Sequence, residues 1–218
     1  NGILIRDAVA LEQAHRVDTV VFDKTGTLTR GKPAVQAFIP LAEQSIEQPL
    51  HLAASLQQDA EHPLAEALRN YAADQGAQIQ GVSDFTVHAG RGASGRVKGQ
   101  PVWLGNARLM QDQGLDLAPW QEEVKRQESQ GHTLTWLAAE TDGNPRLLAL
   151  IASADSLKPG ARETIDQLRA SGIESWLVSG DSQAAATAIA GQLGIEQVRA
   201  QVLPADKARV INELRGEG

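Results

Sequence analysis

Two hydrophobic patterns alternate along the chain, and the first is a short apolar run followed by a loop. Residues 17–23, Val-Asp-Thr-Val-Val-Phe-Asp, predict a strand buried on both faces of a parallel sheet. Residues 24–29, with small hydroxyl side chains around Gly26, predict a loop after it. The same pattern returns after Asp155. There it predicts helices over residues 158–171, 182–193 and 205–215, and strands over 174–179 and 198–200.

The second pattern fills the middle of the chain. Helical spacing covers residues 45–59 and resumes at Pro63, since proline is favourable at the first position of a helix. Residues 80–110 predict short strands separated by glycines, 120–130 a charged helix, and 133–140 with 146–152 a hairpin around Asp142-Gly143. This block is long enough to bury its own core. We therefore expect an α/β domain of residues 1–32 and 152–218, interrupted by an α+β domain with an antiparallel sheet at 33–151.

Composition and charge exclude several classes of function. The 218 residues are 42% hydrophobic and 22% charged, which is typical of a folded globular protein. A net charge of −7 with no basic run is a poor match for nucleic acid or an anionic membrane, so we expect no nucleic-acid partner. The absence of cysteine excludes disulfides, zinc–thiolate sites and thiol catalysis. The apolar stretch at 147–154 is too short for a membrane helix. The start, Asn1-Gly2, reads as a cut inside a longer protein.

Asp23 is the first candidate for chemistry. It ends a strand of the expected parallel sheet, and open α/β sheets place their ligands at that edge. A carboxylate there, followed by the backbone N–H groups of a glycine–threonine loop, is suited to meet a phosphoryl group. The alternative is an aspartate that only caps the following turn.

The residues after Asp23 bring in a resemblance. Asp23-Lys24-Thr25-Gly26-Thr27-Leu28-Thr29 matches the phosphorylation motif of P-type ATPases at every position. Glu61-His62-Pro63-Leu64 resembles the histidine–proline motif of the heavy-metal branch of that family, and Gly90-Arg91-Gly92 and Gly105-Asn106 resemble its nucleotide-binding segments. Residues 3–8 and 10–12 are most similar to the copper(I) and silver(I) exporters.

The resemblance implies a phosphorylation domain of haloacid-dehalogenase type and an inserted nucleotide-binding domain that delivers ATP. It implies that Asp23 is the nucleophile on the γ-phosphate, and that Mg²⁺ is held by Asp23 and the carbonyl of Thr25. The family's remaining Mg²⁺ aspartates are expected beyond residue 218. Lys24, from the same motif, and Ser179, Asp181 and Lys207, from segments resembling later family motifs, complete the expected phosphorylation site.

The resemblance also implies a set of nucleotide contacts in the inserted block. His62 is expected to orient the adenine or its phosphates. The family has glutamate five residues before this histidine, where it accepts from the adenine amino group, and Gln57 stands there instead, still able to accept. The full set is Gln57, Glu61, His62, Gly90, Gly92, Gly105 and Asn106. Gly90-x-Gly92-x-x-Gly95 does not open a helix after a first strand, so we reject a dinucleotide fingerprint.

Plainer interpretations stay open for several of these residues. His62 is suited to capping a helix, Glu61 to being a solvated carboxylate, and Lys207 to being an exposed helix lysine. Ser179-Gly180-Asp181 also fits an ordinary strand-to-helix turn. Asp155 and Lys158 resemble the family's hinge segment, where Asp155 either touches nucleotide or stabilises the hinge.

The sequence therefore predicts the ATP-binding and aspartyl-phosphate-forming region of a P-type ATPase that exports heavy-metal cations, most closely Cu(I). Its partners would be the actuator and membrane domains of the same protein, at the cytoplasmic face of a membrane. One alternative is a phosphatase of haloacid-dehalogenase type, against which Thr25 counts because threonine cannot activate water. The other is a non-catalytic nucleotide-binding module, which Gln57 favours slightly.

Overall fold

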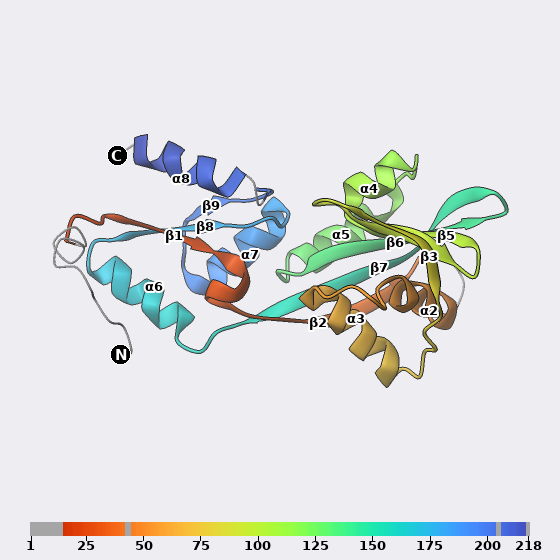
Figure 1. Cartoon of the computed structure of the whole chain (residues 1–218). Coiled ribbons are helices and arrows are strands. Elements are labelled where there is room, and N and C mark those ends of the chain that lie inside the picture. The colour runs from red at the N-terminus through yellow and green to blue at the C-terminus, as the bar shows by residue number, and fades with distance from the viewer. Residues whose placement is uncertain (1–14, 42–44, 204–205, 217–218) are drawn as a thin grey trace.

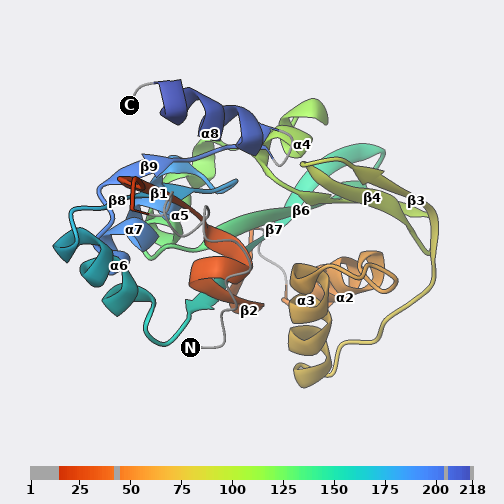
Figure 2. The same cartoon turned by 60° about the vertical axis from the view of Figure 1, so that its left-hand side comes forward.

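The computed structural model describes residues 15–41, 45–203 and 206–216, which form two sheets (Figure 1). The first sheet is parallel, in the order β1-β8-β9, with β1 at Thr19–Asp23, β8 at Glu174–Val178 and β9 at Gln197–Arg199. Helices α6 (Ala161–Ala170) and α7 (Gln183–Leu193) pack on one face and α8 (Lys207–Gly216) on the other, as Figure 2 shows from a second side. This sheet and its helices, with the turn after β1, are called the parallel unit below.

The second sheet is antiparallel and has the order β2-β7-β6-β5-β4-β3. Its strands are β2 (Thr29–Pro40), β3 (Val82–His88), β4 (Gly92–Val97), β5 (Gln100–Gly105), β6 (Thr133–Thr141) and β7 (Asn144–Leu157). Helices α2 (Glu47–Leu56) and α3 (Pro63–Asp74) bury their apolar stripes against one face. Helices α4 (Ala107–Asp112) and α5 (Gln121–Glu128), with the 3₁₀ turn Ala118–Trp120, cover the other. This sheet and its helices are called the antiparallel unit.

The two units are joined through β2 and β7, which pair with each other over most of their length. Both expected domain boundaries, Lys32 and Ala152, lie inside these strands rather than in loops. Strand β2 was not expected from the sequence, because Gly31, Pro33 and Pro40 interrupt its strand pattern. Proline is tolerated there since β2 is an edge strand.

The other expected elements are present with shifted ends. The hairpin is confirmed: Asp142 and Gly143 both have positive φ, 53° and 75°, as a two-residue turn of this kind requires. Helix α4 was not expected, because four of its six residues, 107–110, lie within the stretch predicted as strands. The exporter-like residues 3–8 and 10–12, and Pro204-Ala205, lie outside the described residues. In the described ranges, no helix is both long enough and apolar enough to cross a membrane.

Strands β4 and β5 approach each other most closely at Gly92 and Gly105, which are direct partners. A Cβ on Gly92 would lie 2.2 Å from the carbonyl oxygen of Leu104, and one on Gly105 would lie 2.2 Å from that of Arg91. Both contacts are with backbone, which cannot move aside. The two glycines are therefore required for strand pairing, whatever else they contact.

We expect Gly92→Ala to lower the free energy of unfolding by about 3 kcal/mol, since it adds a backbone clash to a strained φ of +142°. Gly99→Ala is the matched control, because Gly99 also has positive φ but open space around it, and we expect a cost of about 1 kcal/mol. Urea unfolding of both variants measures the difference. Equal losses would show that the close approach of the strands carries no cost.

Candidate functional site

The carboxyl edge of the parallel sheet holds the first group of candidate residues. Strand β1 pairs with β8 in a register that sets Asp23 opposite Val178, so Asp23 and the Ser179–Asp181 loop leave the sheet side by side. A tight turn, Lys24–Leu28, follows Asp23 with Gly26 at φ +76°. The Thr29 hydroxyl closes this turn: it donates to the carbonyl of Lys24 and accepts from the N–H of Gly26, each at 3.2 Å.

Lys24 and Asp181 form a buried ion pair at this edge. Asp181 Oδ2 accepts from the Lys24 ammonium and also from the Ser179 hydroxyl, the latter at 2.7 Å. The hydroxyl of Thr133, the first residue of β6, donates to Oδ1 at 2.7 Å. Burial raises the pKa of the Asp181 carboxyl, but Lys24 and these hydroxyl donors outweigh burial and hold the pKa below its ordinary value. Asp181 is therefore a carboxylate at neutral pH.

Asp23 is arranged differently from its neighbour Lys24. Its carboxylate is 43% exposed and lies 2.8 Å from the ammonium of Lys207, at the start of α8. The expected meeting of Asp23, Ser179, Asp181 and Lys207 is thus observed, with Lys24 added through its ion pair. Thr25 lies exposed in the turn. The edge thus presents one accessible carboxylate beside the ammonium group of Lys207, which is suited to an anionic reactant.

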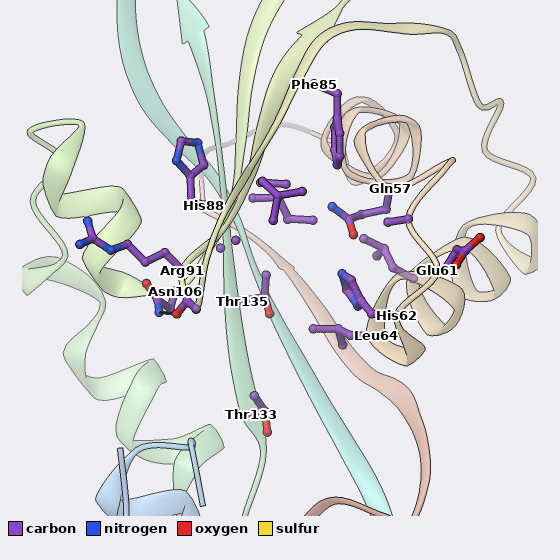
Figure 3. Close-up of a pocket in the computed structure, with 18 of the residues that line it drawn as sticks. Gln57, Glu61, His62, Leu64, Phe85, His88, Arg91, Asn106, Thr133 and Thr135 are labelled. Carbon is purple, nitrogen blue, oxygen red and sulfur yellow. Dashed lines mark hydrogen bonds between the residues drawn. The ribbon is translucent and has the colours of Figure 1, made fainter. Parts of the chain in front are cut away.

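A cavity of about 710 Å³ is the second part of the site (Figure 3). It is bounded by α2, α3, β3, β4, β5 and β6, and reaches the parallel unit at Gly180. All seven expected nucleotide residues line it: Gln57, Glu61, His62, Gly90, Gly92, Gly105 and Asn106. Residues as far apart in sequence as Gln57 and Gly180 thus share one cavity.

His62 both caps a helix and faces this cavity. As the N-cap of α3, its Nδ1 accepts a hydrogen bond from the N–H of Ala65 at 3.2 Å. An accepting Nδ1 places the proton on Nε2, so the ring offers one N–H donor. Partial burial, and after it the charge of Arg69, lower the pKa of His62, which keeps the ring neutral at pH 7.

Gln57 offers a buried hydrogen-bond acceptor to the cavity. Its side chain is 3% exposed and points into the cavity in Figure 3. Within the described residues its Oε1 has no hydrogen-bond partner. A buried acceptor without a partner is costly, and an amino group such as that of adenine would satisfy it.

The remaining expected residues contribute less directly. In Figure 3 the carboxylate of Glu61 points away from the cavity. Asn106 caps α4 by accepting from the N–H of Leu109 at 3.2 Å, and its amide donates to the carbonyl of Gly90 at 2.9 Å. Asn106 thus holds the Gly90 turn against α4. The glycines were expected to let backbone approach a ligand, but at Gly92 and Gly105 the structure gives strand pairing as a sufficient reason.

Several lining residues were not expected from the sequence, and two pairs of them bear on the chemistry of the cavity. Phe85 and Val87 on β3 are 44% and 69% exposed, a large apolar surface that faces the cavity. Their alternation along β3 was a signal that could have been used, because two large apolar side chains on one exposed face of a strand call for a partner. Thr133 and Thr135 on β6 line the cavity as well, and nothing in their local sequence marks them.

A family model described as haloacid dehalogenase-like hydrolase matches residues 17–218. The chain belongs to the haloacid dehalogenase-like hydrolase family. Among curated relatives of this hydrolase, copper-exporting P-type ATPases of Legionella pneumophila and Vibrio cholerae are each 40% identical over the whole of this chain. The chain spans 29% and 23% of their lengths.

Solved structures agree with this assignment. A zinc-transporting PIB-type ATPase in an E2·Pi state matches 99% of this hydrolase-family chain and 34% of its own, with a TM-score of 0.63 and 34% identity. The catalytic domain of the CPx-ATPase CopB-B, studied for changes on nucleotide binding, matches 99% and 73% with a TM-score of 0.71 and 26% identity. The expected fold class, a haloacid-dehalogenase-like parallel sheet with an antiparallel sheet inserted, is confirmed.

Asp155 and Lys158, which resemble the family's hinge segment, support the strands that join the two units. The Asp155 carboxylate accepts from the N–H groups of Gly31 at 2.9 Å and Lys32 at 3.1 Å. Lys158 Nζ donates to the carbonyl of Gly26 at 2.6 Å and so supports the turn after Asp23. Of the two roles left open for Asp155, the geometry favours stabilisation of the hinge.

Mg²⁺ fits this site only as a metal shared with a phosphate. Within the described residues, no three side chains of His, Asp or Glu converge to hold a metal ion. Asp23 offers one accessible carboxylate and Thr25 a backbone carbonyl, which are oxygen donors of the type Mg²⁺ prefers. Mg²⁺ is usually held by one or two carboxylates together with substrate oxygens and water.

We expect His62→Asn to separate the two roles of His62. Asparagine caps helices well, so stability should stay within about 0.5 kcal/mol of the parent. The Nε2 donor is lost, so ATP affinity measured by calorimetry should fall about three- to tenfold. His62→Ala should lose the cap as well, at about 1 kcal/mol. Unchanged affinity in His62→Asn would leave capping as the only role of this residue.

We expect Asp181→Asn to lower the free energy of unfolding at pH 7 by about 3–5 kcal/mol, because Lys24 is left buried without its counter-charge. Folding lowers the pKa of the Asp181 carboxyl. The contribution of this carboxylate to the free energy of unfolding is therefore complete above the ordinary carboxyl pKa, and it is lost as the pH falls through the lowered pKa. The difference in the free energy of unfolding between variant and parent, measured with urea, should persist at pH 5 and become smaller below about pH 4. The exposed Asp142→Asn is the control, and an equal effect there would contradict this assignment.

Proposed function

We propose that this chain is the ATP-binding and aspartyl-phosphate-forming region of a P-type ATPase that exports Cu(I). One observation carries the proposal: a single cavity runs from Gln57 and His62 to Gly180, in the loop that follows Val178, the strand partner of Asp23. A nucleotide whose base lies at the first end has its phosphates directed toward the second. The 40% identity to copper-exporting ATPases supports the choice of metal.

In this proposal residues 33–151 are the nucleotide-binding domain, and residues 1–32 with 152–218 are the phosphorylation domain. Gln57 accepts from the adenine amino group, and His62 donates from Nε2. The apolar faces of Phe85 and Val87 cover the base. The actuator and membrane domains of the same protein are the partners, at the cytoplasmic face of the membrane, and Cu(I) is the cargo of the membrane domain.

The proposed reaction is an in-line phosphoryl transfer to Asp23. A carboxylate oxygen of Asp23 forms a bond to the γ-phosphorus while the bond from that phosphorus to the β,γ-bridging oxygen breaks, and ADP leaves with the electron pair. Lys207, 2.8 Å from Asp23, offsets the negative charge of the transferred group. Mg²⁺ bound with the phosphates would supply further charge neutralisation.

The fate of the acyl-phosphate follows from Thr25. Phosphatases of the family place an acid/base aspartate at this position, two residues after the nucleophile. Threonine hydrogen-bonds a phosphate but does not remove a proton from water. The phosphorylated Asp23 therefore persists, as a transport cycle requires.

We expect Asp23→Asn to abolish phosphoenzyme formation from γ-labelled ATP in the full-length protein, since an amide cannot attack phosphorus. ATP binding should be retained or tightened, because the neutral side chain no longer repels the γ-phosphate. The parent phosphoenzyme should be stable in acid and cleaved by hydroxylamine. Asp18→Asn, an exposed aspartate just before β1, is the control and should still be phosphorylated. Label remaining in Asp23→Asn would overturn the assignment, and rapid release of free phosphate by the parent would favour a phosphatase.

A further inference from the structure

Thr133, in the antiparallel unit, contacts the carboxyl edge of the parallel sheet. It opens β6, and its hydroxyl donates to Asp181 Oδ1 at 2.7 Å. The hydroxyl oxygen of Thr133 also accepts a hydrogen bond from Lys24 Nζ at 3.5 Å. One hydroxyl therefore touches both members of the buried ion pair, and it comes from the opposite unit.

Thr135 shows what a threonine of the same strand does without these contacts. Thr135 lies two residues further along β6 and lines the same cavity (Figure 3). Across the described part of the chain, no hydrogen bond links its side chain to the parallel unit. The two threonines share strand, face and cavity, and differ in the contact with Asp181.

The segment before Thr133 also packs against the parallel unit. Gly131, in the turn between α5 and β6, has φ +81°, and a Cβ there would lie 2.8 Å from Ile189 Cδ1 on α7. Helices α5 and α7 pack together at this point. This apolar packing brings the start of β6 to the edge of the parallel sheet. It does not fix the orientation of the Asp181 carboxylate.

The two oxygens of Asp181 have different donors, and this gives Thr133 its importance. Oδ2 is held by Lys24 and Ser179, both from the parallel unit. For Oδ1, Thr133 supplies a donor from outside that unit. If this donor is removed, a carboxylate oxygen of Asp181 loses a charge-assisted hydrogen bond. The Asp181 carboxylate is then held less firmly, and with it Lys24, the residue next to Asp23.

We propose that Thr133 is a positioning residue for phosphoryl transfer, whose hydroxyl docks the antiparallel unit on the Asp181–Lys24 pair and so aligns the nucleotide cavity with Asp23. The docking rests on the contacts above alone, whereas the alignment of a phosphate rests on the proposed function. Thr133 acts through Asp181 and Lys24 and makes no bond to the reacting atoms.

The docking is tested by a distance measurement that needs no nucleotide. The chain has no cysteine, so Asn70→Cys on α3 and Gln167→Cys on α6, both exposed, place one spin label on each unit. In this doubly labelled chain Thr133→Val should shift or broaden the distance distribution. Thr133→Ser should restore it, and the matched control Thr135→Val should leave it as in the parent.

Circular dichroism checks that each variant is folded, and Thr133→Ala replaces Thr133→Val if the latter unfolds. A distribution in Thr133→Val or Thr133→Ala equal to the parent's would overturn the docking role. A change in Thr135→Val as large as that in Thr133→Val would overturn it as well, since the effect would then not depend on the hydroxyl at 133.

The positioning role is tested in the full-length protein by separating binding from chemistry. Thr133→Val should slow phosphoenzyme formation at saturating ATP about tenfold, the effect of one lost hydrogen bond to a charged group, and change the Kd for ATP less than about twofold. Thr133→Ser should recover most of the rate. An unchanged rate, or a loss confined to the Kd, would overturn the role. If the parent forms no phosphoenzyme, the proposed function fails, while the distance measurement still decides the docking.

Discussion

The buried ion pair between Lys24 and Asp181 is the interaction on which the arrangement of the site depends. Taking two charges out of water is expensive, and such a pair is stable only when further hydrogen bonds satisfy the remaining atoms. Those bonds come from Ser179, after β8, and Thr133, at the start of β6. The pair therefore fixes three segments that are distant in sequence. It also sets Asp23, because the backbone is extended there and successive side chains point in opposite directions. Lys24 turned inward leaves the Asp23 carboxylate outward, facing Lys207.

The strands that join the two units provide the second constraint. A loop at this place would leave the antiparallel unit free to turn, whereas β2 and β7 are hydrogen-bonded to each other across the junction. Their register shifts between Thr29 and Pro33, and there the Asp155 carboxylate receives the N–H groups of Gly31 and Lys32. A side chain thus replaces the missing strand partner. The two units are thus linked by this strand pair and by the hydrogen bond from Thr133 to Asp181.

The parts of the site that could be predicted are those that depend on local order in the chain. An apolar run ending at Asp23 predicts a parallel strand, and parallel topology alone brings Ser179 and Asp181 to the same edge. The position of His62 before Pro63 predicts its capping bond. The rest depends on tertiary approach. Thr133 lies 109 residues from Lys24, and no local pattern marks that contact. Gly92 and Gly105 were expected to contact nucleotide, because the sequence does not reveal that these two residues face each other on paired strands.

The distribution of charge along the cavity favours one direction for a bound nucleotide. The lining near Gln57 includes an amide, an imidazole whose pKa is lowered by burial and by Arg69, and the exposed faces of Phe85 and Val87, together with the acidic residues Asp59 and Glu61. Beyond Gly180, at the carboxyl edge of the parallel sheet, lie the ammonium groups of Lys24 and Lys207, which are paired with Asp181 and Asp23. An unpaired carboxylate at position 57 would carry a large desolvation cost, whereas the amide keeps an acceptor for the base without a buried charge. Phosphates placed near Gln57 would approach the carboxylates of Asp59 and Glu61, which is unfavourable, whereas phosphates beyond Gly180 would approach Lys207 and Lys24. In the proposed function, Gln57 therefore offers the base an acceptor without adding a further negative charge, and the phosphates are directed toward Asp23.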